Sequence, residues 1–195
     1  MRTIVVVCTL AAVGVLGLTG CATAPKTESA KAGLNSEVQT AIKVARNTDP
    51  GLQKFFDTAA GYAVFPKVGK GAVGVGGAYG RGELYEGGKA VGYCKLTQAS
   101  IGLALGGQEY TEIIFFETPE AVSRLKAGNC TFAAQASAVA LKSGASANAK
   151  YADNVLVFTM SQAGLMFEAS IGGQKFSFEP ILTVRTAQPA GSATK

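Results

Sequence analysis

The sequence predicts an α+β fold of predominantly antiparallel β structure, with two N-terminal helices and one inserted helix. Apolar residues recur at helical spacing between residues 36 and 59, whereas short β-rich runs separated by glycine fill residues 62–178. Several blocks of the second region return about 66 residues later, which indicates an internally duplicated β unit. Because glycine-rich strands curve easily and fray at open edges, we expect a curved, barrel- or sandwich-like sheet.

Two helices are expected before the first strand. Asn35 or Ser36 caps the first helix, and Gln39 completes a capping-box pattern. Asp49 caps the second helix, and Pro50 occupies its first position. The first helix has one apolar face at i, i+3, i+4 and i+7, formed by Val38, Ala41, Ile42 and Ala45.

Strands and turns follow in the remainder of the chain. One helix interrupts them, with Thr118 as its cap, Pro119 at its start and Gly128 at its end. Residues 86–89 and 153–154 have the composition of hairpin turns. The expected strands are residues 62–65, 72–78, 90–96, 101–105, 112–116, 131–141, 155–160, 165–170 and 174–178.

The internal repeat supports one compact β unit. Residues 72–73 return as 138–139, and residues 106–108 return as 172–174, each at a spacing of 66. Two copies are too few for a solenoid. They indicate two similar sheets packed together, or one sheet closed on itself.

The N-terminus resembles the leader of a bacterial lipoprotein. Residues 4–18 are apolar or small, and these 15 residues are fewer than the roughly 20 that span a membrane. Leu18 to Cys21 then resembles a lipobox, which implies acylation of Cys21 and cleavage before it. The alternative is ordinary secretion with cleavage near Ala24. We expect a lipid-anchored envelope protein at the outer membrane, with its domain in the periplasm or at the cell surface.

The expected organisation has four parts. They are a signal peptide at residues 1–20, a lipidated flexible tether at 21–34, one domain at 35–182 and a flexible tail at 183–195.

Composition argues against an enzyme. The chain contains no histidine, which excludes Ser-His-Asp and Cys-His catalysis, and no CxxC pair indicates zinc. We therefore expect no cofactor and no metal. Two of the carboxylates Glu83, Glu86, Glu109 and Glu112 could form a glycosidase pair, but no motif favours this over an ordinary surface. The formal charge of +5 is mild and its cations are scattered, so no nucleic-acid partner is expected.

Two cysteines remain beyond the leader and the lipidation site. An exported compartment permits a disulfide between Cys94 and Cys130. The alternative is two separate buried thiols.

Several blocks of the chain resemble the SYLF domain family. The resemblance extends over about residues 35–180, nearly the whole expected mature chain, and is carried by residues 61–66, 71–82, 96–100, 112–116, 132–149 and 158–178. The resemblance implies binding of phosphoinositides or other anionic lipids, and in some eukaryotic members of actin, which the expected compartment lacks. It also implies that the first helix contributes to lipid binding, here through Lys43 and Arg46.

The cations among the glycines are the best candidates for a head-group site. Lys67, Lys70 and Arg81 lie beside glycines whose exposed amides, together with a cation, can hold a phosphate. The alternative is turn glycines with solvated cations. We therefore expect a non-enzymatic protein that binds membrane lipids through its acyl anchor and its domain. The alternative function is a structural or protein-interaction module with an unknown partner.

Overall fold

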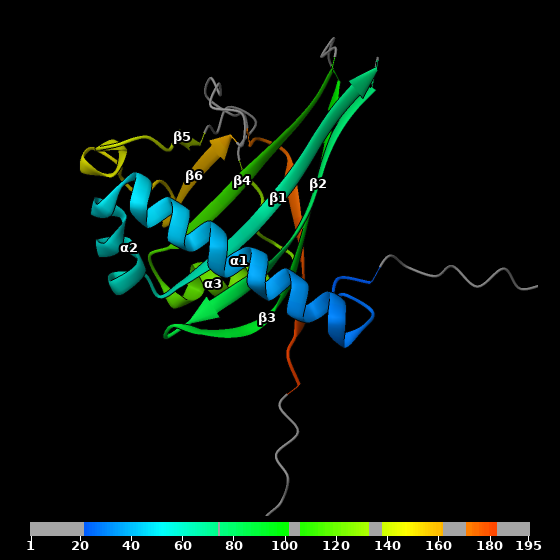
Figure 1. Ribbon diagram of the computed structural model, residues 1–195, viewed down its shortest axis with the longest axis horizontal. Helices are drawn as coiled ribbons and strands as arrows, with labels where there is room; N and C mark the ends of the chain where they lie inside the picture. Colours follow the sequence, from blue (N-terminus) through cyan, green and yellow to red (C-terminus); the bar gives the residue numbers. More distant parts are fainter. Residues whose placement is uncertain (1–21, 74, 102–105, 133–137, 162–170, 183–195) are drawn as a thin grey trace, which may run out of the picture.

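The computed structural model describes residues 22–73, 75–101, 106–132, 138–161 and 171–182. Within them, three α-helices flank a single sheet with the strand order β5-β6-β4-β1-β2-β3-β7 (Figure 1). The helices are α1 (Glu28–Thr48), α2 (Gln53–Thr58) and α3 (Pro119–Lys126), with 3-10 turns η1 (Pro50–Leu52) and η2 (Ala145–Ala147). The strands are β1 (Gly61–Val73), β2 (Val75–Glu86), β3 (Lys89–Ile101), β4 (Gly106–Phe116), β5 (Val139–Ala140), β6 (Val155–Ser161) and β7 (Gln174–Pro180). The α+β class with a mostly antiparallel sheet is confirmed.

The first four strands are longer than the sequence predicted. β1 to β4 pair antiparallel in the order β4-β1-β2-β3, and the predicted strand 72–78 belongs to two of them, β1 and β2. Glycines inside these strands bring neighbouring groups close. A Cβ on Gly82 would clash with the backbone oxygen of Val64. Glycine therefore extends the strands here instead of ending them, because it permits this close approach.

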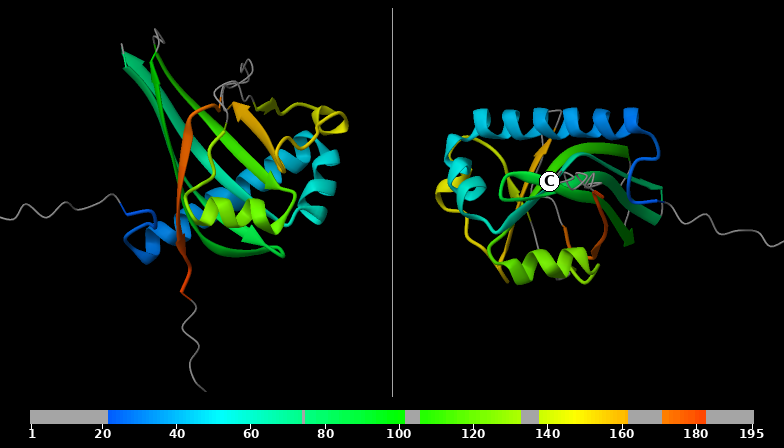
Figure 2. Two further views of the ribbon diagram at one scale, coloured as in Figure 1. Left: turned by 180° about the vertical axis from the view of Figure 1, so that it is seen from behind. Right: turned by 90° about the horizontal axis from the view of Figure 1, so that it is seen from below.

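The sheet separates two helical layers. α1 crosses one face and α3 lies on the other (Figure 2). We call the α1 side the outer face and the α3 side the inner face. The outer core packs α1 and α2 on the sheet through Val38, Ile42, Phe55, Phe56, Tyr62, Val64, Ile113, Phe115 and Phe158. The inner core packs α3 on the sheet through Ala63, Phe65, Val68, Ala78, Leu84, Cys94, Leu96, Ile114, Val122 and Leu125.

The first helix begins earlier than predicted. The side chain of Thr27 caps α1 by accepting a hydrogen bond from the amide of Ala30 at 3.1 Å. Neither Asn35 nor Ser36 is the cap, and residues 28–34 are helical instead of part of a flexible tether. In this segment Glu28 and Lys31 form an ion pair of 2.8 Å at the i, i+3 spacing, which stabilises a helix.

The other local signals are confirmed. Asp49 caps the 3-10 turn η1, which starts at Pro50 and leads directly into α2, by accepting a hydrogen bond from the amide of Gly51 at 3.0 Å. Thr118 caps α3 by accepting a hydrogen bond from the amide of Ala121 at 3.3 Å. Both predicted turns are tight. Gly87, Gly88, Asp153 and Asn154 all have positive φ, and Gly128 ends α3 with φ of 72°.

Closure of the sheet is not confirmed. β5 and β7 lie at its two edges, so the curved sheet is open within the described chain. The predicted repeat does not form a second sheet. β6 pairs with β4 and β7 pairs with β3, at opposite ends, because each adds to the nearest free edge of the central strands. Of the predicted strand 131–141, the described residues form β5 and one bridge at Thr131. Residues 133–137 and the predicted strand 165–170 lie outside the described residues.

Cys21 and the leader also lie outside the described residues. Among the described helices, none is long and apolar enough to cross a membrane.

Candidate functional site

The structure separates the predicted cations. Lys67 on β1 and Arg81 on β2 are directly opposed in the antiparallel ladder. Directly opposed residues share one face of a sheet, and the ion pair of Lys67 with α1 identifies this as the outer face. Lys70 is opposed to Ala78, which packs in the inner core. Lys70 therefore lies on the inner face and cannot join the other two.

A bulge in β1 decides which of Lys67 and Lys70 faces outward. The register of β1 shifts between Val64 and Lys67 against β2, and between Phe65 and Val68 against β4. The extra residue allows Phe65 and Val68 both to pack in the inner core, although they are three positions apart. Because Val68 points inward, Lys67 before it points outward and Lys70 points inward.

A third cation, which the sequence analysis did not identify, lies beside Lys67 and Arg81 on the next strand. Lys95 on β3 is directly opposed to Arg81. We call Lys67, Arg81 and Lys95 the cation row. Neighbouring strands lie about 4.8 Å apart, so the row sets three cations side by side across β1, β2 and β3. Like charges directly opposed across strands destabilise a sheet, and an anion that bridges them relieves the repulsion.

The position of Lys95 opposite Arg81 could not be predicted by counting residues from the turn between β2 and β3. The register between β2 and β3 shifts by one residue between Leu84 and Tyr85. Counted without this shift from the Glu86 and Lys89 pair, Arg81 would face Cys94, and Lys95 would lie on the other face. The position of a bulge depends on packing that a sequence pattern does not show.

Glu37 of α1 partly neutralises the row. Its carboxylate lies 2.6 Å from the ammonium of Lys67, and both side chains are about half exposed, at 45% and 50%. This hydrogen bond and the charge of Glu37 raise the pKa of Lys67, and the charge of Glu109 on β4 adds to the effect. Among the described residues, Arg81 has no carboxylate partner, and its guanidinium lies 6.0 Å from the ring of Tyr79.

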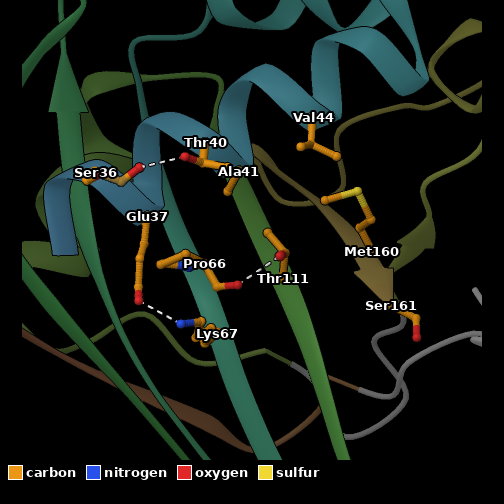
Figure 3. A pocket seen from close by; sticks show the side chains of 10 residues that line it. All are labelled: Ser36, Glu37, Thr40, Ala41, Val44, Pro66, Lys67, Thr111, Met160 and Ser161. Atoms are coloured by element: carbon orange, nitrogen blue, oxygen red, sulfur yellow. Dashed lines mark hydrogen bonds and ion pairs between the residues drawn. The ribbon is translucent and has the colours of Figure 1, made fainter. Parts of the chain in front are cut away.

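Two pockets meet at this ion pair. The first has a volume of about 470 Å³ and lies between α1 and strands β1, β4 and β6 (Figure 3). The second has a volume of about 320 Å³ and includes Pro25, Tyr79 and Arg81. Glu37, Pro66 and Lys67 line both. The second pocket is therefore lined by Lys67 and Arg81 of the cation row, and the first extends from Lys67 beneath the helix.

The two predicted cations of α1 lie apart from this site. Lys43 is exposed on the helix. The guanidinium of Arg46 lies 4.4 Å from the ring of Phe56, next to α2. Neither residue lines the two pockets at Lys67. Arg46 has the geometry of a cation–π contact that anchors the helix end.

A second polar cluster is buried on the inner face. Glu112 of β4 is fully buried and accepts a hydrogen bond from Gln174 of β7 at 2.9 Å. Burial raises the pKa of Glu112 to about 7, although hydrogen bonds with Gln174 and Tyr110 oppose the change. Because β4 and β7 are not neighbours, this bond crosses the inside of the curved sheet. No other carboxylate faces Glu112 in the described residues, so a glycosidase pair is not formed there.

The two cysteines are separate. Cys94 and Cys130 are both buried, and both are free thiols. Each occupies an apolar position in the inner core, which is the alternative that the sequence left open, and the disulfide is not formed. Burial raises the pKa of both thiols. Within the described residues, no group of His, Cys, Asp and Glu could hold a metal ion.

Comparisons with known proteins agree with this description. Residues 97–182 match the family model described as "Ysc84: Las17-binding protein actin regulator". The protein named beta cell expansion factor A, from Aeromonas veronii, is 28% identical over 165 residues, which are 82% of this chain and 61% of that relative. The matched family is a family of binding modules and is not a known enzyme family. Residues 97–182 are thus similar to the family whose motifs the sequence resembles, and the relative extends this similarity over most of the chain.

Proposed function

We propose that this domain binds anionic lipids through the cation row on its outer face, in a protein held to the bacterial envelope by acyl chains on Cys21. The observation that carries the proposal is the row itself. Two of its members are directly opposed to a third, an arrangement that concentrates positive charge on one part of the outer face. Clustered cations gain about 1 kcal/mol each at an anionic membrane surface.

The surroundings of the row support contact with a membrane surface. Tyr79 is 45% exposed and lies next to Arg81 on β2. An exposed tyrosine has an apolar ring and a polar hydroxyl, a combination favoured at membrane interfaces. The tether of an acylated Cys21 would lead to the same side, because Pro25 lines the pocket that includes Arg81.

Vesicle binding tests the proposal. The chain from Ala22 to Lys195 lacks the acyl anchor and retains all the described residues, which have their own two cores. We expect it to sediment with vesicles of phosphatidylglycerol at low salt, to be released as salt rises, and not to sediment with phosphatidylcholine. Absence of binding to the anionic vesicles at low salt would contradict the proposal.

A pair of matched variants locates the surface. Arg81→Glu reverses the central charge of the row, and we expect it to abolish sedimentation. Lys70→Glu makes a charge change of the same size on the inner face, and we expect it to bind like the unchanged protein. Equal losses in the two variants would show that only net charge matters and would contradict a site at the row.

A protein partner is the second candidate function. The description of the matched family model, "Las17-binding protein actin regulator", concerns protein binding. For this chain we propose an envelope protein as the partner in that case. Crosslinking that recovers one specific protein, together with no vesicle binding, would favour this function over lipid binding.

A further inference from the structure

The 470 Å³ pocket beneath α1 has the character of a chain-binding site. It has the size of a small-molecule pocket. Val44 of α1, 42% exposed, and Met160 of β6 face one another across it (Figure 3). Ala41 and Pro66 add further apolar surface.

The floor of this pocket has few free polar groups. The bulge at Pro66 would leave its carbonyl oxygen unpaired, but the hydroxyl of Thr111 donates a hydrogen bond to it at 2.8 Å. Pro66 itself has no amide hydrogen. The pocket is therefore mainly apolar along its length, and its charged groups, Glu37 and Lys67, stand together at one end.

Charge and shape together indicate the ligand class. Binding to a flat bilayer surface needs the cation row alone and makes no use of a pocket under the helix. A cation pair that adjoins an apolar pocket complements a molecule with one anionic head and one hydrocarbon chain. We propose that this groove binds a single-chain anionic amphiphile, with its head between Lys67 and Arg81 and its chain between Val44 and Met160.

Glu37 regulates this site. The carboxylate of Glu37 pairs with the ammonium of Lys67, so an anionic head group must displace this carboxylate to bind Lys67. Exposed ion pairs contribute little free energy, and the half-exposed pair of Glu37 and Lys67 can exchange with a ligand anion. The inference rests on the proposed function, because it assigns the head-group site to the same cations.

The test uses dodecyl phosphate as monomers, below its micelle concentration, with calorimetric titration of residues 22–195. Methyl phosphate supplies the head without the chain. We expect dodecyl phosphate to bind at least about tenfold more tightly than methyl phosphate, because apolar burial adds to the head-group contact. Equal affinities would overturn the inference.

Two variants on α1 test the chain pocket. Val44→Glu places a charge in the pocket from an exposed helix position, and we expect about a tenfold loss of dodecyl phosphate binding. Asn47→Glu, also exposed on α1, changes the net charge equally but lies outside the pocket lining, and binding should persist. Loss in both, or in neither, would overturn the chain assignment. Circular dichroism establishes that each variant is folded.

A second pair of variants tests the competition between Glu37 and the ligand for Lys67. Glu37→Gln removes the competing carboxylate, and we expect dodecyl phosphate to bind about two- to fivefold more tightly, the scale of an exposed ion pair. Glu109→Gln removes an equal charge that acts on Lys67 without the short contact, and its gain should be smaller. Equal gains in affinity in the two variants would overturn the regulatory role of Glu37. Vesicle binding in the same protein separates the hypotheses, since vesicle binding without monomer binding overturns this inference and leaves the proposed function standing.

Discussion

Two carboxyl groups on opposite faces of the sheet lie in opposite environments. On the outer face, Glu37 and Lys67 are about half exposed, and their charges remain accessible. On the inner face, Glu112 is fully buried beside Tyr110 and Gln174, and its pKa rises to about 7 because burial disfavours the carboxylate. The carboxyl group of Glu37 is thus part of an exchangeable surface, whereas that of Glu112 is a fixed internal contact. Exposure, and not residue type, separates a binding surface from a structural cluster.

The inner cluster holds the shape on which the outer surface depends. The hydrogen bond from Gln174 to Glu112 joins strands that are separated by β1, β2 and β3. It therefore helps to fix the curvature of these three strands, which carry the cation row. The comparison predicts that inner changes affect stability and that outer changes affect binding.

The largest effect on stability is expected from Gln174→Leu. This substitution leaves a buried carboxyl without its donor from β7. Because an unsatisfied buried group carries its full desolvation cost, we expect the free energy of unfolding to fall by about 3 kcal/mol at pH 8. Urea unfolding measures the change. A loss well under 1 kcal/mol would show that the cluster does not join the ends of the sheet.

The next effect is a pH dependence that arises from Glu112. Its folded pKa of about 7 lies above the ordinary value of 4.5, so the folded state binds the proton more tightly. Stability is full below pH 4.5 and falls as the pH rises through 7. We expect a loss of about 2 kcal/mol between pH 5 and pH 8.

The control for this pH dependence is Glu112→Gln, which keeps the shape and cannot ionise. The unfolding free energy of this variant should not fall by about 2 kcal/mol between pH 5 and pH 8, as that of the unchanged protein does. If the unchanged protein and the variant have parallel pH profiles, the carboxyl does not titrate in the folded state as described.

The smallest effect on stability is expected on the outer face. Lys67→Met removes an ion pair between half-exposed side chains, and such pairs contribute about 0–1 kcal/mol. We expect the midpoint of urea unfolding to change little, while binding to phosphatidylglycerol vesicles weakens. A large loss of stability would place Lys67 among the structural residues and remove the contrast between the faces.

The sequence predicted what local chemistry determines. Asp49 with Pro50 and Thr118 with Pro119 marked helix starts correctly, because a cap acts within one turn. The start of α1 at Glu28 was missed because residues 28–34 have no apolar face. The glycine runs misled the strand assignment, since those glycines permit close packing within long strands.

The composition of the candidate site could not be predicted in full for a different reason. Side chains alternate between faces, so a single bulge decides which face a residue occupies. The bulge beside Lys67 sends Lys70 to the inner face, and the register shift beside Leu84 brings Lys95 opposite Arg81. Both shifts arise from how the cores pack. The sequence identified Lys67 and Arg81 as candidates, but not their true neighbours.

A single tryptophan tests most directly where lipid meets the domain. The chain contains no tryptophan, so Tyr79→Trp gives one reporter beside Arg81 on the outer face. Ser123→Trp gives a matched reporter at an exposed position of α3. With phosphatidylglycerol vesicles, we predict that emission from Tyr79→Trp shifts to the blue, while emission from Ser123→Trp does not change. A blue shift only in Ser123→Trp, or in neither protein, would contradict lipid binding at the cation row.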